Sequence, residues 1–123
     1  MEPSSWNAPG ALALVNQLSS NPVRASIAAP FRRPGAGHVF HQYVLRCENR
    51  AEVQAHFKAQ GIGTGIHYPV PVHLQPAYKD RSPLGPAGCA ETARASEEVL
   101  SIPMYPELSE AQVERICAAL QAL

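Results

Sequence analysis

The chain has 123 residues, of which 46% are hydrophobic and 16% are charged, which indicates one globular domain rather than a disordered chain. Ten basic residues balance ten acidic residues. This balance argues against a nucleic-acid partner, because the phosphate backbone attracts clustered positive charge. The three cysteines are widely spaced and form neither a disulfide framework nor a zinc motif. No early apolar run is long enough to cross a membrane, so we expect a cytoplasmic protein without a membrane partner.

The first third of the chain carries weak signals. Residues 1–22 remain unassigned, with a short helix over residues 11–18 as one option. Residues 23–29 partly alternate between apolar and other residues, which predicts a short strand. Residues 39–47 are rich in β-branched and aromatic types and predict a second strand. Its period of two places one set of side chains on a single face, and among them we expect a partly buried histidine at position 41: Val39, His41, Tyr43, Leu45 and Cys47.

A helix is predicted directly after this strand. Asn49 and Glu52 have the spacing of a capping box, and Val53 and Phe57 stand one turn apart on its buried face. Gly61 is expected to end the helix, because glycine adopts the left-handed conformation without strain. The glycines of residues 61–65 leave a helix rather than enter one, which argues against a phosphate loop. Residues 62–68 then predict a further strand.

Proline is over-represented, with 12 in the chain, and five of them lie between residues 69 and 86. We therefore expect a loop over residues 72–88, with a short helix around residues 74–79. Residues 89–99 predict a helix and residues 100–103 a short strand. A capping box at residues 109–112 begins the last helix. The element order predicts an α+β two-layer domain, with a three- or four-stranded, mostly antiparallel sheet and helices on one face.

Residues 67–73 (HYPVPVH) carry the most chemistry. Two imidazoles and a phenol lie on a strand end and a proline-stiffened loop, which suits recognition of a polar ligand because little entropy is lost on binding. Structural packing explains the same residues equally well at this point. A metal site is not expected, because His38 and His41 should point to opposite faces of a strand and no zinc spacing is present.

Three strings resemble, in this order, the C-terminal small domain of the DegT/StrS-type sugar aminotransferases. They are HVFHQYVLR at 38–46, GIGTGIHYPVPVHLQPAYKD at 61–80 and EEVLSIPMYPELSEAQVERICAAL at 97–120. That family consists of pyridoxal-phosphate enzymes of fold type I that aminate keto-sugars attached to nucleotides. The resemblance covers about residues 29–123, and residues 23–30 continue it, so we assign residues 23–123 to this domain.

The resemblance also implies site residues. His67 and Tyr68 are expected to face the substrate, with His73 and Tyr78 as further candidates, through hydrogen bonds to sugar or phosphate oxygens. Residues of the last strand and its turn are expected to pack: Ile102, Pro103 and Tyr105.

The large domain of the family carries the Schiff-base lysine and the groups that bind pyridoxal phosphate. Neither lysine of this chain, Lys58 or Lys79, matches a family catalytic position. The resemblance therefore implies no catalytic, metal-binding or cofactor-binding residue here, and no transamination by the chain alone. We expect a detached small domain that contributes nucleotide-sugar binding and active-site closure to a large aminotransferase domain.

Two alternatives stay open at this point. The chain could be a stand-alone binding module for a sugar nucleotide or a protein partner, or it could be a vestigial domain without activity. If the chain is a detached small domain, the face that meets the large domain in the family is bare, and an exposed apolar patch favours self-association; in a stand-alone module, residues 1–22 could cover that face. We therefore expect a homodimer or larger homo-oligomer.

Overall fold

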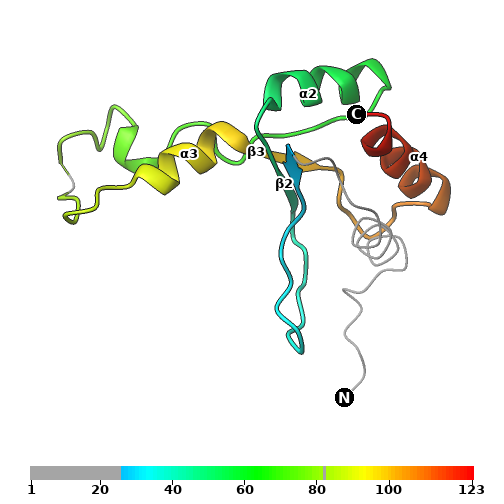
Figure 1. Cartoon of the computed structure of the whole chain (residues 1–123), viewed down its shortest axis with the longest axis horizontal. Coiled ribbons are helices and arrows are strands. Elements are labelled where there is room, and N and C mark those ends of the chain that lie inside the picture. Colours follow the sequence, from blue (N-terminus) through cyan, green and yellow to red (C-terminus); the bar gives the residue numbers. More distant parts are fainter. Residues whose placement is uncertain (1–25, 82) are drawn as a thin grey trace.

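The computed structural model describes residues 26–81 and 83–123. In these residues, strands β1 (Ile27–Ala28), β2 (Tyr43–Cys47) and β3 (Val99–Ile102) form one antiparallel sheet in the order β1-β2-β3. Helices α2 (Arg50–Ala59), α3 (Ala90–Glu98) and α4 (Glu110–Gln121) and the short 3-10 helix η1 (Val72–Leu74) complete the described fold (Figure 1). This confirms the predicted α+β class with an antiparallel sheet. The optional helix over residues 11–18 lies outside the described residues.

The hydrophobic core joins the sheet to α2 and α4. Along β2, Tyr43, Leu45 and Cys47 are buried and the residues between them are not, as the period of two predicts. The register sets Leu45 opposite Leu100 and Tyr43 opposite Ile102, so that large apolar side chains of two strands meet. The two helices contribute further buried residues to this cluster: Val53 and Phe57 from α2, and Val113, Ile116, Cys117, Ala119 and Leu120 from α4. Ile27, Ile62 and Leu108 complete it.

The strand predicted over residues 39–47 begins only at Tyr43. Residues before it belong to a long excursion away from the sheet, between β1 and β2 (Figure 1). Phe40 has a φ of 43°, which no strand residue adopts, and Val39 is 75% exposed. The residue types at 39–42 suit a strand, but none of the described strands pairs with them, and strand propensity depends on such a partner.

The two predicted capping boxes differ in outcome. At α4, the Ser109 hydroxyl accepts from the backbone N–H of Gln112 at 3.3 Å, and the Gln112 side chain accepts from the Ser109 N–H at 2.9 Å. At α2, Asn49 is the N-cap residue but makes no side-chain capping bond, so that capping box was wrong. Gly61 has a φ of 70° directly after the helix, as predicted for the residue that ends it.

The segment predicted as a strand over residues 62–68 pairs at one point only, an isolated bridge between Gly65 and Ser101. Glycines at positions 63 and 65 weaken extended pairing, because they lack a side chain that packs on a neighbouring strand. The short helix expected around residues 74–79 lies earlier, as η1. It ends before Pro76, because the residue preceding a proline is restricted to extended conformations and Gln75 has a ψ of 139°.

Helix α3 is attached to the sheet by polar contacts, since none of its residues is buried. The Arg46 Nε on β2 donates to Oε2 of Glu98 at 2.8 Å, and the Arg94 Nε donates to Oε1 of the same carboxylate at 3.1 Å. Arg50 donates to the backbone carbonyl of Ser96. Partial desolvation raises the pKa of Glu98, but the hydrogen bonds and charges of the two arginines outweigh it and hold the pKa below its ordinary value. Charge rather than apolar burial therefore sets the position of α3.

Candidate functional site

His67 is brought to the sheet by the bridge at Gly65. The Gly65 N–H donates to the carbonyl of Ser101 at 2.9 Å, and the Ser101 N–H donates to the carbonyl of Gly65 at 2.7 Å. Two residues later, Nδ1 of His67 lies 2.9 Å from the Ser101 hydroxyl, within hydrogen-bond distance. Two segments that lie far apart in the sequence, residues 65–67 and Ser101, thus determine where the imidazole lies.

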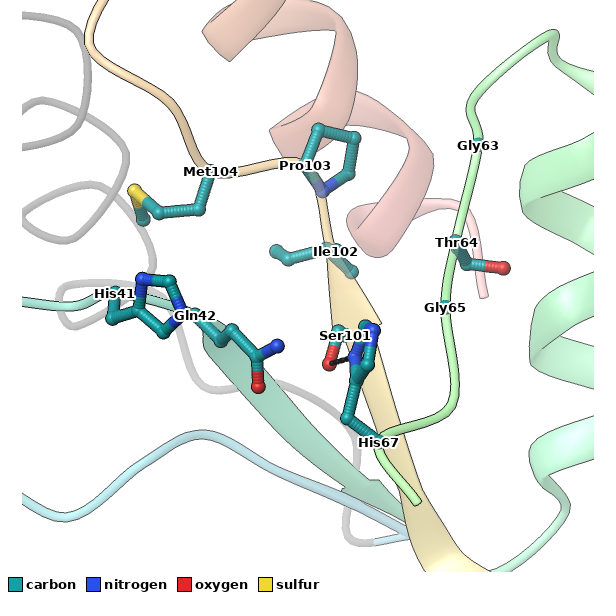
Figure 2. A pocket seen from close by; sticks show the side chains of 10 residues that line it. All are labelled: His41, Gln42, Gly63, Thr64, Gly65, His67, Ser101, Ile102, Pro103 and Met104. Atoms are coloured by element: carbon teal, nitrogen blue, oxygen red, sulfur yellow. Dashed lines mark hydrogen bonds between the residues drawn. The ribbon is translucent and has the colours of Figure 1, made fainter. Parts of the chain in front are cut away.

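A cavity of about 400 Å³ opens beside this imidazole. Figure 2 shows His41 and Gln42 on one side of it, Thr64 on the other, and His67 against Ser101. Apolar side chains at the end of β3 and just after it complete the wall: Ile102, Pro103 and Met104. Within the part of the chain that the structure describes, no lysine, arginine, aspartate or glutamate lines this cavity. Its polar groups are two imidazoles, two hydroxyls and a carboxamide, which suit hydrogen bonds to a polar ligand.

A second cavity, of about 300 Å³, lies between the proline-rich loop and α3. His67 and Tyr68 line it from the loop, and Thr92 and Ser96 line it from the helix. Its wall is mostly apolar, because residues 70–72 and Val99 contribute to it. The rings of His67 and Tyr68 are nearly perpendicular, at 88°, with centroids 5.6 Å apart. His67 therefore lines both cavities, and Tyr68, at 73% exposed, lines the second.

The other two residues predicted by resemblance lie elsewhere. His73 is in η1 and Tyr78, which is half exposed, is in the turns that follow. Neither lines the two cavities. The structure thus brings His67 and Tyr68 together and leaves His73 and Tyr78 apart from them. Of the residues predicted to pack, Ile102 is buried, Pro103 is half-buried, and Tyr105 is 41% exposed, so that it packs only in part.

Sequence reasoning missed four polar residues of the first cavity, which are His41, Gln42, Thr64 and Ser101. His41 was expected to be partly buried, but it is exposed and lines the cavity, because the predicted strand does not reach it. Gln42 and Thr64 carried no signal of their own. Ser101 did carry one, since it is a lone polar residue in the apolar run of residues 99–102 and is only 7% exposed.

Comparison with known proteins gives the family. The model of the DegT/DnrJ/EryC1/StrS aminotransferase family matches residues 10–121, which extends the resemblance upstream of residue 23. The chain belongs to this family. It is 40% identical over 97 residues to UDP-2-acetamido-2-deoxy-3-oxo-D-glucuronate aminotransferase of Pseudomonas aeruginosa, covering 79% of this chain and 26% of that protein. It is 36% identical over 118 residues to dTDP-3-amino-3,4,6-trideoxy-alpha-D-glucose transaminase of Streptomyces venezuelae, covering 95% and 31%.

Solved structures of the family have the same fold. Superposition on S. venezuelae DesV, crystallised with a ketimine intermediate, gives a TM-score of 0.82 at 36% identity. The match covers 96% of this chain and 32% of DesV. The chain thus spans about a quarter to a third of the length of the relatives it matches, and it corresponds to a fragment of such an aminotransferase.

Family membership implies pyridoxal phosphate, and the described residues do not fit a covalently held cofactor. Lys58 on α2 and Lys79 in the proline-rich loop are both exposed, and neither lines either cavity. No group of three or more His, Cys, Asp or Glu residues gathers in the described part of the chain to hold a metal ion. None of the described helices has the length and apolarity needed to cross a membrane.

Proposed function

We propose that this chain acts as the small domain of a sugar aminotransferase, where it binds the nucleotide sugar and closes the active site, and that it does not transaminate alone. The position of His67 carries this proposal. The residue predicted by resemblance to face the substrate lies where two cavities meet, one polar and one mostly apolar. An imidazole in such a place can donate or accept a hydrogen bond with a ligand oxygen.

Nucleotide sugars are the proposed ligand class. The two curated relatives described above are named for sugars linked to uridine and thymidine diphosphates. Among residues 26–81 and 83–123, no lysine or arginine lines the polar cavity, so we assign to it the neutral oxygens of the ligand rather than the diphosphate. The flat ring of Tyr68 beside the second cavity suits stacking against a sugar or a base.

The proposed partner is a large aminotransferase domain. The loop that carries His67 exposes a run of large apolar side chains: Tyr68, Val70, Val72, Leu74, Tyr78 and Leu84. Apolar side chains gathered on one loop are typical of a surface that another protein covers. In the isolated chain the same surface favours self-association. Sedimentation velocity at increasing concentration is expected to show a homodimer or larger species, and a monomer at every concentration would contradict this.

A binding titration tests the ligand. The purified chain is titrated with UDP- and dTDP-linked sugars and, separately, with UDP and dTDP alone, while NMR amide shifts are followed. We expect saturable shifts near His67 and Tyr68 with the sugar-linked forms, and weaker ones with the nucleotides alone. His67→Ala should weaken binding about tenfold, comparable with the loss of one hydrogen bond, so that the shifts saturate only at higher ligand concentration. His73→Ala, a matched change in the same segment that touches neither cavity, should leave it intact. No shifts at millimolar ligand would contradict autonomous binding.

A chimera tests the aminotransferase role. The chain replaces the matching region of the S. venezuelae transaminase, to which it aligns over 118 residues. We expect transamination by the chimera and none by the chain alone. In the chimera, His67→Ala should raise KM for the nucleotide sugar, while Tyr78→Phe should not. A chimera that folds, binds pyridoxal phosphate and remains inactive would favour the vestigial interpretation.

A further inference from the structure

The imidazole of His67 lies directly against the bare backbone of Gly65. A Cβ atom placed on Gly65 would come within 2.8 Å of Cε1 of His67 and within 3.5 Å of both ring nitrogens. Real Cβ atoms do not approach so closely, so the ring occupies space that only glycine leaves open. Gly65 has no positive φ, and its backbone conformation does not itself demand glycine. The need for glycine at position 65 therefore comes from the imidazole.

Ser101 offers the ring a fixed partner. Its backbone pairs with β2 on one side, in register with Val44, and with Gly65 on the other. The residue is 7% exposed, so its hydroxyl has little freedom to move. With Nδ1 engaged by this hydroxyl, Nε2 has no hydrogen-bond partner among residues 26–81 and 83–123. A ring held in this way presents one nitrogen to the cavity and loses little entropy when a ligand binds.

We propose that Gly65 and Ser101 are positioning residues that hold the His67 imidazole in one orientation, with Nδ1 bound to the Ser101 hydroxyl and Nε2 directed to the ligand. The Ser101 hydroxyl donates to Nδ1, so that the proton of the neutral ring is on Nε2 and can be donated to a sugar or phosphate oxygen. The use of Nε2 by a ligand rests on the proposed function, whereas the orientation of the ring does not.

The orientation is tested first without ligand. Nitrogen-15 shifts of the His67 ring are recorded in the ligand-free chain at a pH where the ring is neutral. In the unmodified chain we expect widely separated shifts for a protonated Nε2 and an unprotonated Nδ1. Ser101→Ala should move both toward the averaged values of a free histidine, and Ser101→Thr, which keeps the hydroxyl, should restore the separation. Unchanged ring shifts in Ser101→Ala, or a protonated Nδ1 in the unmodified chain, would overturn the proposal.

Two glycine variants test whether the His67 ring needs the space that Gly65 leaves open. Gly65→Ala should displace the ring and change its shifts, and because a side-chain tip gives way more easily than backbone, the melting temperature should change little. Gly63→Ala is the matched control for the ring shifts, since Gly63 lies two residues earlier and has nothing within 4 Å of its Cβ position. Equal ring shifts in the two variants would refute the role of Gly65.

A double-mutant cycle separates this inference from the proposed function. Gly65→Ala and Ser101→Ala should each weaken nucleotide-sugar binding about tenfold, comparable with the loss of one hydrogen bond. In the His67→Ala background both should have no further effect, because they act through that ring. Full effects in that background would overturn the positioning role. A chain with the ordered ring that binds no nucleotide sugar would support the positioning of His67 and overturn autonomous ligand binding, and an inactive chimera with the same ordered ring would overturn the proposed function.

Discussion

Phe57 on α2 is the side chain whose removal should harm the fold most clearly. Its ring is 0% exposed, and it is one of two buried residues, with Val53, through which α2 joins the core. Burying such a ring stabilises the folded state by about 1.5–3 kcal/mol. Phe57→Ala also leaves a cavity, so we expect a loss of about 3–5 kcal/mol in the free energy of unfolding. A domain of this size is stable by only about 5–15 kcal/mol.

Urea denaturation followed by far-ultraviolet circular dichroism measures this loss. With a slope of about 2 kcal/mol per molar urea, the midpoint should fall by about 2 M. Phe31→Ala is the matched control, because Phe31 is 85% exposed, and it should change the stability by about 0.5 kcal/mol or less. If Phe57→Ala does not fold, Phe57→Leu should fold with a loss of about 1 kcal/mol. Equal midpoints for the Phe57 variants and Phe31→Ala would refute the placement of α2 on the core.

Ser109→Ala should lower the free energy of unfolding by about 1 kcal/mol, and Asn49→Ala by less, because only Ser109 makes a side-chain capping bond; equal losses in urea melts would contradict this. Burial raises the pKa of the Cys47 thiol to about 11, so iodoacetamide should label the partly exposed Cys89 first by mass spectrometry. In the unfolded chain the Cys47 thiol has its ordinary pKa of 9.0, so the free energy of unfolding should fall as the pH rises from 9.0 toward 11. Cys47→Ala should reduce this dependence of stability on pH. The pKa of Glu98 is lowered in the folded chain, so its stabilising effect is present above its ordinary pKa and lost as pH falls; urea midpoints of Glu98→Gln and the unmodified chain should differ at neutral pH and converge in acid.

The prediction of α4 from the sequence was reliable because its signals are local. Ser109 and Gln112 are three residues apart and form their capping box without help from the rest of the fold. The period of the apolar residues that follow already identifies the buried face. The same holds for Gly61, whose left-handed conformation follows from the end of α2.

The strands were harder to predict because they depend on partners. Residues 39–42 and 62–68 have strand-like composition, yet β2 begins at Tyr43 and the second segment pairs only at Gly65. Whether an extended segment becomes a strand is decided by the neighbour that accepts its hydrogen bonds, which can be far away in the sequence. The exposed position of His41 follows from this, and with it a side chain of the polar cavity.

The amino-acid sequence by itself determined the α+β class, the helices α2, α3 and α4, the core face of β2 and the resemblance that singles out His67 and Tyr68. Each of these rests on a period, a cap or a motif that is complete within a few residues. Only the tertiary structure decided that Ser101, 34 residues after His67, meets its imidazole, that Gly65 makes room for the ring, and that His73 and Tyr78 lie apart. The first two arrangements arise from one backbone bridge between distant segments, Gly65 and Ser101, and a contact of that kind leaves no periodic pattern in the sequence.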